Sequence, residues 1–244
     1  MSSTLPPSVS DARAALASAE RVARTVDEFT GLLRGRVRLG AVSGVAGEGF
    51  DLAGVLAEFH AAHPGVTVGL TEHTSEHMLE ALRHGGLDIA LVGLTGAPIA
   101  EHLGVDVVLD TALVAAVALD SPLREALPVA ALAEHRLICL PHGTGVRGVL
   151  DRACAAAGFA PEIAYEGAAP PLLLQLAAHG LGVAIVPGLT ETEAARFGVR
   201  ALAIVDPPLR GRLALVRHRD RPGNPAAAAA ELLDRLRRAF GAPA

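Results

Sequence analysis

Hydrophobic and polar positions alternate between two periods over residues 36–93 of the sequence. Short apolar runs are separated by longer segments whose apolar residues recur at spacings of three and four, as on one face of a helix. Strands are therefore predicted at 37–42, 66–70 and 87–92, and helices at 52–63 and 75–84. Two β-α-β units follow one another, which predicts a parallel, doubly wound sheet.

The same alternation continues to the end of the chain. Strands are predicted at 107–109, 113–119, 137–140, 162–165, 183–186 and 213–216, and helices at 129–134, 145–157, 171–179 and 226–240. The simplest topology is an α/β fold of two Rossmann-like lobes. Lobe one takes residues 35–113 plus 215–244, and lobe two takes 114–214. Two crossing segments, near 112–116 and 213–217, predict a hinge with a ligand cleft between the lobes.

A separate helix is predicted over residues 10–34, after a disordered tail at 1–9. Its apolar positions form a heptad seam. The residues expected to pair two subunits are Leu16, Ala19, Ala23, Val26, Phe29 and Leu33. The seam lies outside any β-α-β unit that could bury it, which favours a dimerisation helix. A surface helix packed on its own domain is the alternative.

Composition narrows the class of protein. The 244 residues are 51% hydrophobic, without a run long enough to span a membrane and without a visible secretory signal. We therefore expect a cytoplasmic protein. The net charge of −5 argues against a broad phosphate-binding face. Cys139 and Cys154 offer neither a disulfide framework nor metal-ligand spacing.

Several phrases, in order, resemble one family. They are RVRLGAV, FDLAGVLAEFHAAHPGVTVGLTEHTSEHMLEALRHGGLDIALVG, PLREALPVAALAEHRLICLP, RGVLDRACAAAGFAPEIAYE and LLLQLAAHGLGVAIVPGL. Together they resemble the effector-binding domain of LysR-type transcriptional regulators over about 210 residues, from 35 to the end. The resemblance implies a fold like that of type 2 periplasmic binding proteins. It also implies that the helix over 10–34 is the linker helix that pairs subunits.

One part of the family pattern is missing from the printed sequence. In the family, a winged helix-turn-helix precedes the linker helix, whereas here only MSSTLPPSV does. We therefore expect that this chain does not contact DNA directly. Its expected partners are a small-molecule effector, a second copy in a homodimer or larger homo-oligomer, and in one scenario a full-length LysR-type subunit.

Candidate effector-binding residues lie in turns that follow predicted strands, where small residues and helix N-termini favour anions. They are Ser43, Gly44, Val45, Thr95, Gly96, His142, Thr144, Arg147 and Pro187. The resemblance implies that the turn around Ser43 lines the effector pocket. Arg147 is expected to offer a bidentate fork to a carboxylate. Ordinary turns, and a surface or inter-lobe salt bridge at Arg147, are the alternatives.

Other motifs carry less weight. Residues 143–148 formally satisfy G-x-G-x-x-G, but the motif lies in mid-chain and a single match is weak. His73 and His77 are four apart, yet no third metal ligand accompanies them. No G-x-S-x-G, H-E-x-x-H or P-loop is present. No cofactor and no metal are expected.

The sequence thus predicts an effector-sensing and oligomerising domain of a LysR-type regulator, which binds a small, anionic metabolite between two lobes. It would control transcription through a DNA-binding domain outside this chain. A free-standing solute-binding protein of the periplasmic type is the main alternative, and an enzyme is the other.

Overall fold

The computed structural model describes residues 33–43, 51–219 and 225–241. In chain order the elements are β1 (Gly35–Ala41), α2 (Leu52–Ala62), β2 (Val66–Glu72), α3 (Ser75–Arg83), β3 (Ile89–Gly93), β4 (Leu103–Ala118), β5 (Leu127–Pro128), the 3-10 helix η1 (Val129–Glu134), β6 (Leu137–Cys139), α4 (Gly145–Ala156), β7 (Ile163–Glu166), α5 (Pro170–Ala178), β8 (Val183–Pro187), α6 (Glu191–Phe197), β9 (Val199–Val205), β10 (Arg210–His218) and α7 (Pro225–Ala239). The predicted tail at 1–9 and nearly all of the predicted helix over 10–34 lie outside the described residues.

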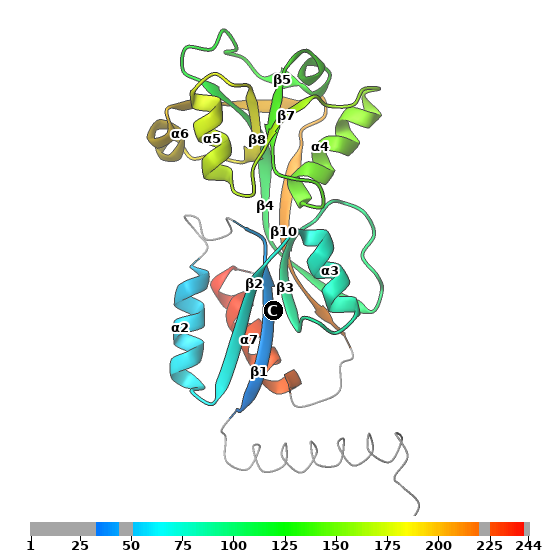
Figure 1. Ribbon diagram of the computed structural model, residues 1–244, viewed down its shortest axis with the longest axis vertical. Helices are drawn as coiled ribbons and strands as arrows, with labels where there is room; N and C mark the ends of the chain where they lie inside the picture. The colour runs from blue at the N-terminus through cyan, green and yellow to red at the C-terminus, as the bar shows by residue number, and fades with distance from the viewer. Residues whose placement is uncertain (1–32, 44–50, 220–224, 242–244) are drawn as a thin grey trace, which may run out of the picture.

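The strands form one continuous path, in the order β2-β1-β3-β10-β4-β8-β6-β7. β1 is parallel to β2 and β3, and β6 is parallel to β7 and β8, whereas β10 runs antiparallel to β3 and β4. Figure 1 shows the result as two α/β lobes joined through β4 and β10. The predicted fold class, two lobes of alternating strands and helices, is confirmed.

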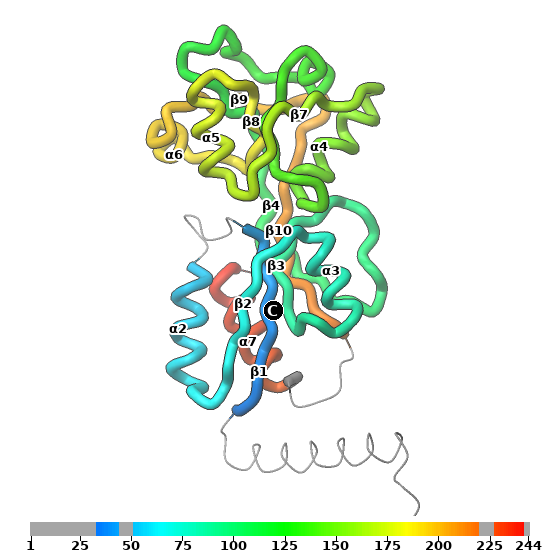
Figure 2. Tube along the Cα trace, in the orientation of Figure 1, coloured from blue at the N-terminus to red at the C-terminus, as the bar shows by residue number. Residues whose placement is uncertain are grey.

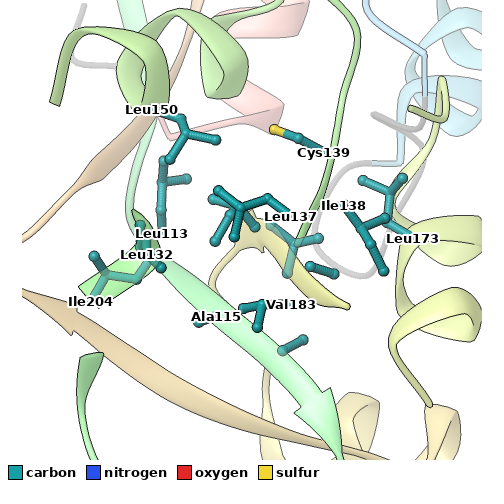
Figure 3. Close-up of a cluster of buried hydrophobic side chains, with 14 of the residues drawn as sticks. Leu113, Ala115, Leu132, Leu137, Ile138, Cys139, Leu150, Leu173, Val183 and Ile204 are labelled. Atoms are coloured by element: carbon teal, nitrogen blue, oxygen red, sulfur yellow. The ribbon is translucent and has the colours of Figure 1, made fainter. Parts of the chain in front are cut away.

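Each lobe has its own hydrophobic core. In lobe one, α2 and α7 cover one face of the sheet around Phe59 and Leu232, and α3 covers the other face around Met78. Lobe two has a single larger cluster (Figure 3), in which the strand residues Leu137 and Val183 gather with Leu150 of α4 and Leu173 of α5. Because buried apolar residues of the two lobes form separate clusters, each lobe is stabilised mainly from within.

The connection between the lobes differs from the expected one. We expected two strands, 107–109 and 113–119, separated by Asp110 and Thr111, but β4 is a single strand of 16 residues. The polar pair does not break it, because Thr111 pairs with Gly211 and Asp110 with Arg212 on β10. The tube in Figure 2 shows β4 and β10 running side by side between the lobes.

The return crossing also starts earlier than expected. β10 begins at Arg210, and Leu213 already pairs with Gly93 of lobe one. Residues 213–214, which the sequence placed in lobe two, therefore belong to the sheet of lobe one.

Three elements of lobe two, β5, α6 and β9, were not predicted. α6 has a recognisable start, because Thr190 and Glu193 form a reciprocal capping box. It ends at Gly198, which adopts a left-handed conformation. β9 then pairs with β4, and β5 with β9. The capping signal was present in the sequence, but seven residues are too few for a clear helical period.

Candidate functional site

The carboxyl ends of the parallel strands in both lobes face one cavity. β1, β2 and β3 point toward it from lobe one, and β6, β7 and β8 from lobe two. Its volume is about 310 Å³, near the lower end of the usual range for ligand pockets. Among the described residues the lining consists of Val42, Ser43, His73, Thr74, Gly93, Leu109, Thr111, Leu140, Pro141, Thr144, Gly145, Val146, Ala168, Pro170, Pro187, Gly211, Arg212 and Leu213.

The back wall of the cavity is the antiparallel ribbon of β4 and β10. Leu109 is paired with Leu213, and Thr111 with Gly211, so these four residues share one face of the ribbon. A larger residue in place of Gly211 would be crowded, because a Cβ atom there would lie 2.7 Å from a methyl group of Leu113. The ribbon thus supplies a mostly apolar wall that belongs to both lobes.

Three helices begin at the cavity, and their first turns differ in hydrogen bonding. The hydroxyl of Thr74 caps α3 by accepting from His77 N at 3.4 Å. α5 begins with two prolines, which have no N–H groups to offer. At α4, the Thr144 hydroxyl does not cap the helix, because it donates to the carbonyl of Pro141 at 2.7 Å. The first N–H groups of α4 are therefore free of a side-chain cap.

The lobes touch beside the cavity, along the start of α4. Glu76 N donates to Gly143 O at 3.0 Å, which is a direct hydrogen bond between the lobes. A Cβ atom on Gly145 would lie 2.6 Å from the carbonyl carbon of Gly93, so only glycine fits there.

The same contact accounts for the glycine motif at 143–148. A Cβ atom on Gly143 would lie 3.1 Å from Glu76 Oε2, and one on Gly148 would lie 2.8 Å from Thr95 Cβ. Each of the motif's glycines therefore packs against lobe one. Close approach of the lobes at Gly145 and Gly148, together with the left-handed backbone of Gly143 (φ 80°), explains the spacing without a dinucleotide.

Arg147 lies beneath the cavity wall in a network of charged groups. Its guanidinium donates to Asp151 Oδ1 at 2.8 Å and to Glu166 Oε1 at 2.5 Å, and its Nη2 lies 2.7 Å from His142 Nε2. The side chain is only 7% exposed. Burial by itself lowers the pKa of Arg147, but the bonds to Asp151 and Glu166 outweigh it and raise the pKa.

The structure separates the predicted effector-binding residues into three groups. Those that line the cavity are Ser43, Thr144 and Pro187. Those that do not line it are Thr95, Gly96, His142 and Arg147. Those outside the described residues are Gly44 and Val45. The guanidinium fork of Arg147, which we expected to face a ligand, is instead occupied by acidic groups of its own lobe.

The predicted dimerisation residues are largely beyond the described part of the chain. Leu16, Ala19, Ala23, Val26 and Phe29 lie outside it. Leu33 is described, and it packs on the core of lobe one. Its apolar side chain therefore has a partner within its own lobe.

Sequence reasoning missed the back wall of the cavity. Leu109, Thr111 and Leu213 sit within strands rather than in turns after strands, and their role depends on how β4 and β10 pair. The alternation of their side chains was visible, but no local pattern shows which face of an inter-lobe ribbon lines a cavity.

Both cysteines are buried thiols in lobe two. Burial raises the pKa of Cys139 to about 12 and that of Cys154 to about 11. Both are therefore protonated near neutral pH, and neither has the character of a reactive thiolate.

The described residues include a pair of neighbouring histidines. The rings of His73 and His77 are close, with centroids 4.3 Å apart. Within 33–43, 51–219 and 225–241, no group of three or more potential metal ligands gathers. In the same ranges, no helix combines the length and the apolar character that crossing a bilayer requires.

A two-lobed α/β domain with a cavity between the lobes is suited to binding a small molecule. The family described as LysR substrate binding domain matches residues 30–241, and the chain belongs to this family. The chain is 32% identical over 210 residues to a probable hydrogen peroxide-inducible genes activator of Mycobacterium avium, which covers 80% of this chain and 66% of that protein. It is 26% identical over 205 residues to the transcriptional dual regulator GltC of Bacillus subtilis, with 83% and 67% covered.

The chain thus spans about two thirds of the length of these relatives, which are named as transcriptional regulators rather than as enzymes. Solved structures share the fold. The effector-binding domain of QuiR in complex with shikimate has a TM-score of 0.69 at 18% identity, covering 84% of this chain and 96% of that one. A Corynebacterium glutamicum OxyR C206 mutant has a TM-score of 0.66 at 23% identity, covering 94% and 71%.

Proposed function

We propose that this chain is the effector-sensing part of a transcriptional regulator and that it binds a small molecule in the cavity between its lobes. The observation that carries this proposal is the cavity itself, whose wall combines residues from both lobes and from the ribbon that joins them. The names of the relatives support the regulatory role. The shikimate bound to the QuiR domain supports binding of a small molecule by this fold.

Binding in such a cavity can be converted into a change of shape. A ligand that touches both lobes favours the inter-lobe angle in which its contacts are best, and so shifts the population toward that angle. The contact of Glu76 with Gly143 and the packing of Gly145 on Gly93 would change with the angle, because each joins one lobe to the other. In the proposed regulator, a DNA-binding domain outside the printed sequence receives this change.

The proposed regulator acts in the cytoplasm as a homodimer or larger homo-oligomer, paired in part through residues 10–34. Introducing Leu16→Asp together with Val26→Asp places charges on the heptad seam and is expected to reduce the mass measured by light scattering to that of a monomer. A wild-type chain that is already monomeric would exclude pairing through this seam.

Peroxide sensing, which the name of the M. avium relative suggests, is not part of the proposal. A peroxide-sensing cysteine must be a thiolate that oxidant can reach. Cys139 and Cys154 are both buried, and burial raises both pKa values. An effector bound without covalent chemistry suits this chain better.

The proposed function can be tested by thermal unfolding of the chain in the presence of a broad set of metabolites. A ligand at 100 times its Kd stabilises the native state by about 2.7 kcal/mol, which corresponds to a rise in Tm of roughly 5–10 °C for a chain of this size. The matched variants are Ala168→Leu, which fills the cavity from an exposed position, and Ala160→Leu, which is also exposed but does not line it.

We expect the rise to disappear in Ala168→Leu and to persist in Ala160→Leu. A ligand that stabilises both variants equally binds elsewhere, and that result would contradict the proposed site.

A further inference from the structure

The helix α4 faces lobe one along one of its sides (Figure 1). Gly145, Gly148 and Arg152 follow one another at spacings of three and four residues, so they lie on the same face of the helix. The other face carries Val146 and Leu150, which are buried in the core of lobe two. α4 is therefore fixed in lobe two by one face and rests on lobe one with the other.

The surface that α4 meets is the turn after β3, and the approach is as close as atoms allow. A Cβ atom on Gly145 would lie 2.6 Å from the carbonyl carbon of Gly93. A Cβ atom on Gly148 would lie 2.8 Å from Thr95 Cβ, whereas ordinary contacts of a Cβ atom are 3.4–4 Å long. Because the helix backbone already touches this turn, the lobes cannot approach further on this side.

The turn after β3 is held in place within lobe one. Gly93 N donates to Ser75 Oγ at 2.9 Å, and Ser75 is completely buried at the start of α3. Leu94 N donates to the carbonyl of Arg212 at 2.8 Å, which ties the turn to β10. The turn is thus bound to a helix and to a strand of its own sheet, and it cannot retreat from α4 without disturbing both.

α4 is held in place within lobe two in a comparable way. Leu150 is completely buried among strands of that lobe. Arg147 bonds to Asp151 one turn further along the helix, and to Glu166 at the end of β7. A push against the glycine face of α4 is therefore passed to lobe two as a whole.

We infer that the contact of Gly145 and Gly148 with Gly93 and Thr95 is a stop that sets the angle between the lobes. The lobes are also joined by the β4–β10 ribbon, so bending of this ribbon moves α4 toward the turn or away from it. The stop ends the approach at the angle at which backbone meets backbone. It acts with or without a ligand, and the inference does not depend on the proposed function.

The substitution Gly148→Ala tests the stop, because helix propensity and the contact predict opposite results. In a helix that touches nothing, alanine in place of glycine is stabilising. At the stop, the lobes would have to separate by roughly 1 Å at this point to restore an ordinary contact. Thr95 cannot yield easily, because the atoms that crowd the new methyl group are its Cβ and Cγ2 rather than the end of a long side chain.

The measurement is the relative orientation of the lobes in the whole chain. Residual dipolar couplings of backbone amides, fitted separately for each lobe, report this orientation. We expect Gly148→Ala to rotate the lobes relative to the wild type and to lower the midpoint of urea unfolding. In a Thr95→Gly background the same substitution should leave the orientation unchanged and raise the midpoint, because the methyl group then has room.

A milder variant and a control complete the experiment. Gly93→Ala enlarges the other side of the contact, where the new Cβ would lie 3.0 Å from Gly145 Cα, so it should rotate the lobes in the same direction by a smaller amount. This variant decides the question if Gly148→Ala does not fold. Ala160→Leu enlarges an exposed position of lobe two and should leave the orientation as it is in the wild type.

The opposite results would overturn the inference. An unchanged orientation in both Gly148→Ala and Gly93→Ala would show that the clash is absorbed inside one lobe. A higher midpoint for Gly148→Ala in the wild-type background would show that the helix does not press on Thr95. A rotation that persists in the Thr95→Gly background, or one that also appears in Ala160→Leu, would have a cause other than this contact.

Discussion

Replacing Arg147 by Met should destabilise lobe two far more than replacing an arginine of an exposed ion pair. Arg147→Met removes the bonds to Asp151, Glu166 and His142 while keeping much of the buried volume. Removing one partner of a fully buried ion pair costs about 3–5 kcal/mol. The side chains of Asp151 and Glu166 are 33% and 43% exposed, so water can solvate them once Arg147 is gone. We therefore expect a loss of about 2–3 kcal/mol.

The assay is urea unfolding at neutral pH, followed by circular dichroism. The control is Arg83→Met, because Arg83 forms an ion pair with Glu80 in which both side chains are about half exposed. That substitution should cost less than about 0.5 kcal/mol. Adding Glu166→Gln to Arg147→Met should recover part of the loss, because it removes a carboxylate that has lost its partner. Equal costs for Arg147→Met and Arg83→Met would refute the reasoning.

Four further substitutions or treatments have definite expected outcomes. Cys139 and Cys154 should react with a thiol reagent at pH 8 only after the chain has unfolded. Their raised pKa values leave on the order of one thiolate in 1,000 or fewer in the native state. Rapid reaction of the folded chain would contradict their burial. In the folded state both thiols keep their protons above pH 9.0, the ordinary pKa of a cysteine. Their contribution to the free energy of unfolding should therefore be complete below pH 9.0 and fall as the pH rises toward 11–12. Urea unfolding at a series of pH values can measure this fall. Gly145→Ala should lower the free energy of unfolding in urea by about 1–3 kcal/mol. The new Cβ would lie 2.6 Å from the carbonyl carbon of Gly93 and would force α4 away from lobe one. An unchanged midpoint would show that the lobes can separate freely there. Thr190→Ala removes the capping box of α6 and should destabilise that helix by about 1 kcal/mol. The loss can be measured as faster amide exchange over residues 191–197. Unchanged exchange would indicate that tertiary contacts hold the helix in place.

The positions of most helices and strands were determined by the sequence itself. Alternating periods located β1 to β3 and the two helices between them within a few residues, because burial of one helix face or of both strand faces leaves a local pattern. The ordered family phrases extended this to lobe two. Where the local pattern was interrupted by polar residues, as at Asp110 and Thr111, the prediction failed, since those residues are accommodated by pairing with β10 a hundred residues later.

The candidate site depended much more on tertiary structure. Sequence reasoning placed Ser43, Thr144 and Pro187 at strand ends and helix starts, and these residues do line the cavity. It also gave Arg147 a ligand-binding role, but it had no means to show that Glu166, on a different strand, occupies the guanidinium.

What the sequence determined by itself is therefore the series of elements, the two-lobed class of fold and the family, because these follow from local periodicity and from ordered phrases. Only the tertiary structure decided which face of the β4–β10 ribbon lines the cavity and that the guanidinium of Arg147 is bound by Glu166. Both depend on pairings between residues far apart in the chain. The motif at 143–148 illustrates the difference, since its glycines are local in sequence while the atoms that crowd Gly145 and Gly148, at Gly93 and Thr95, belong to the other lobe.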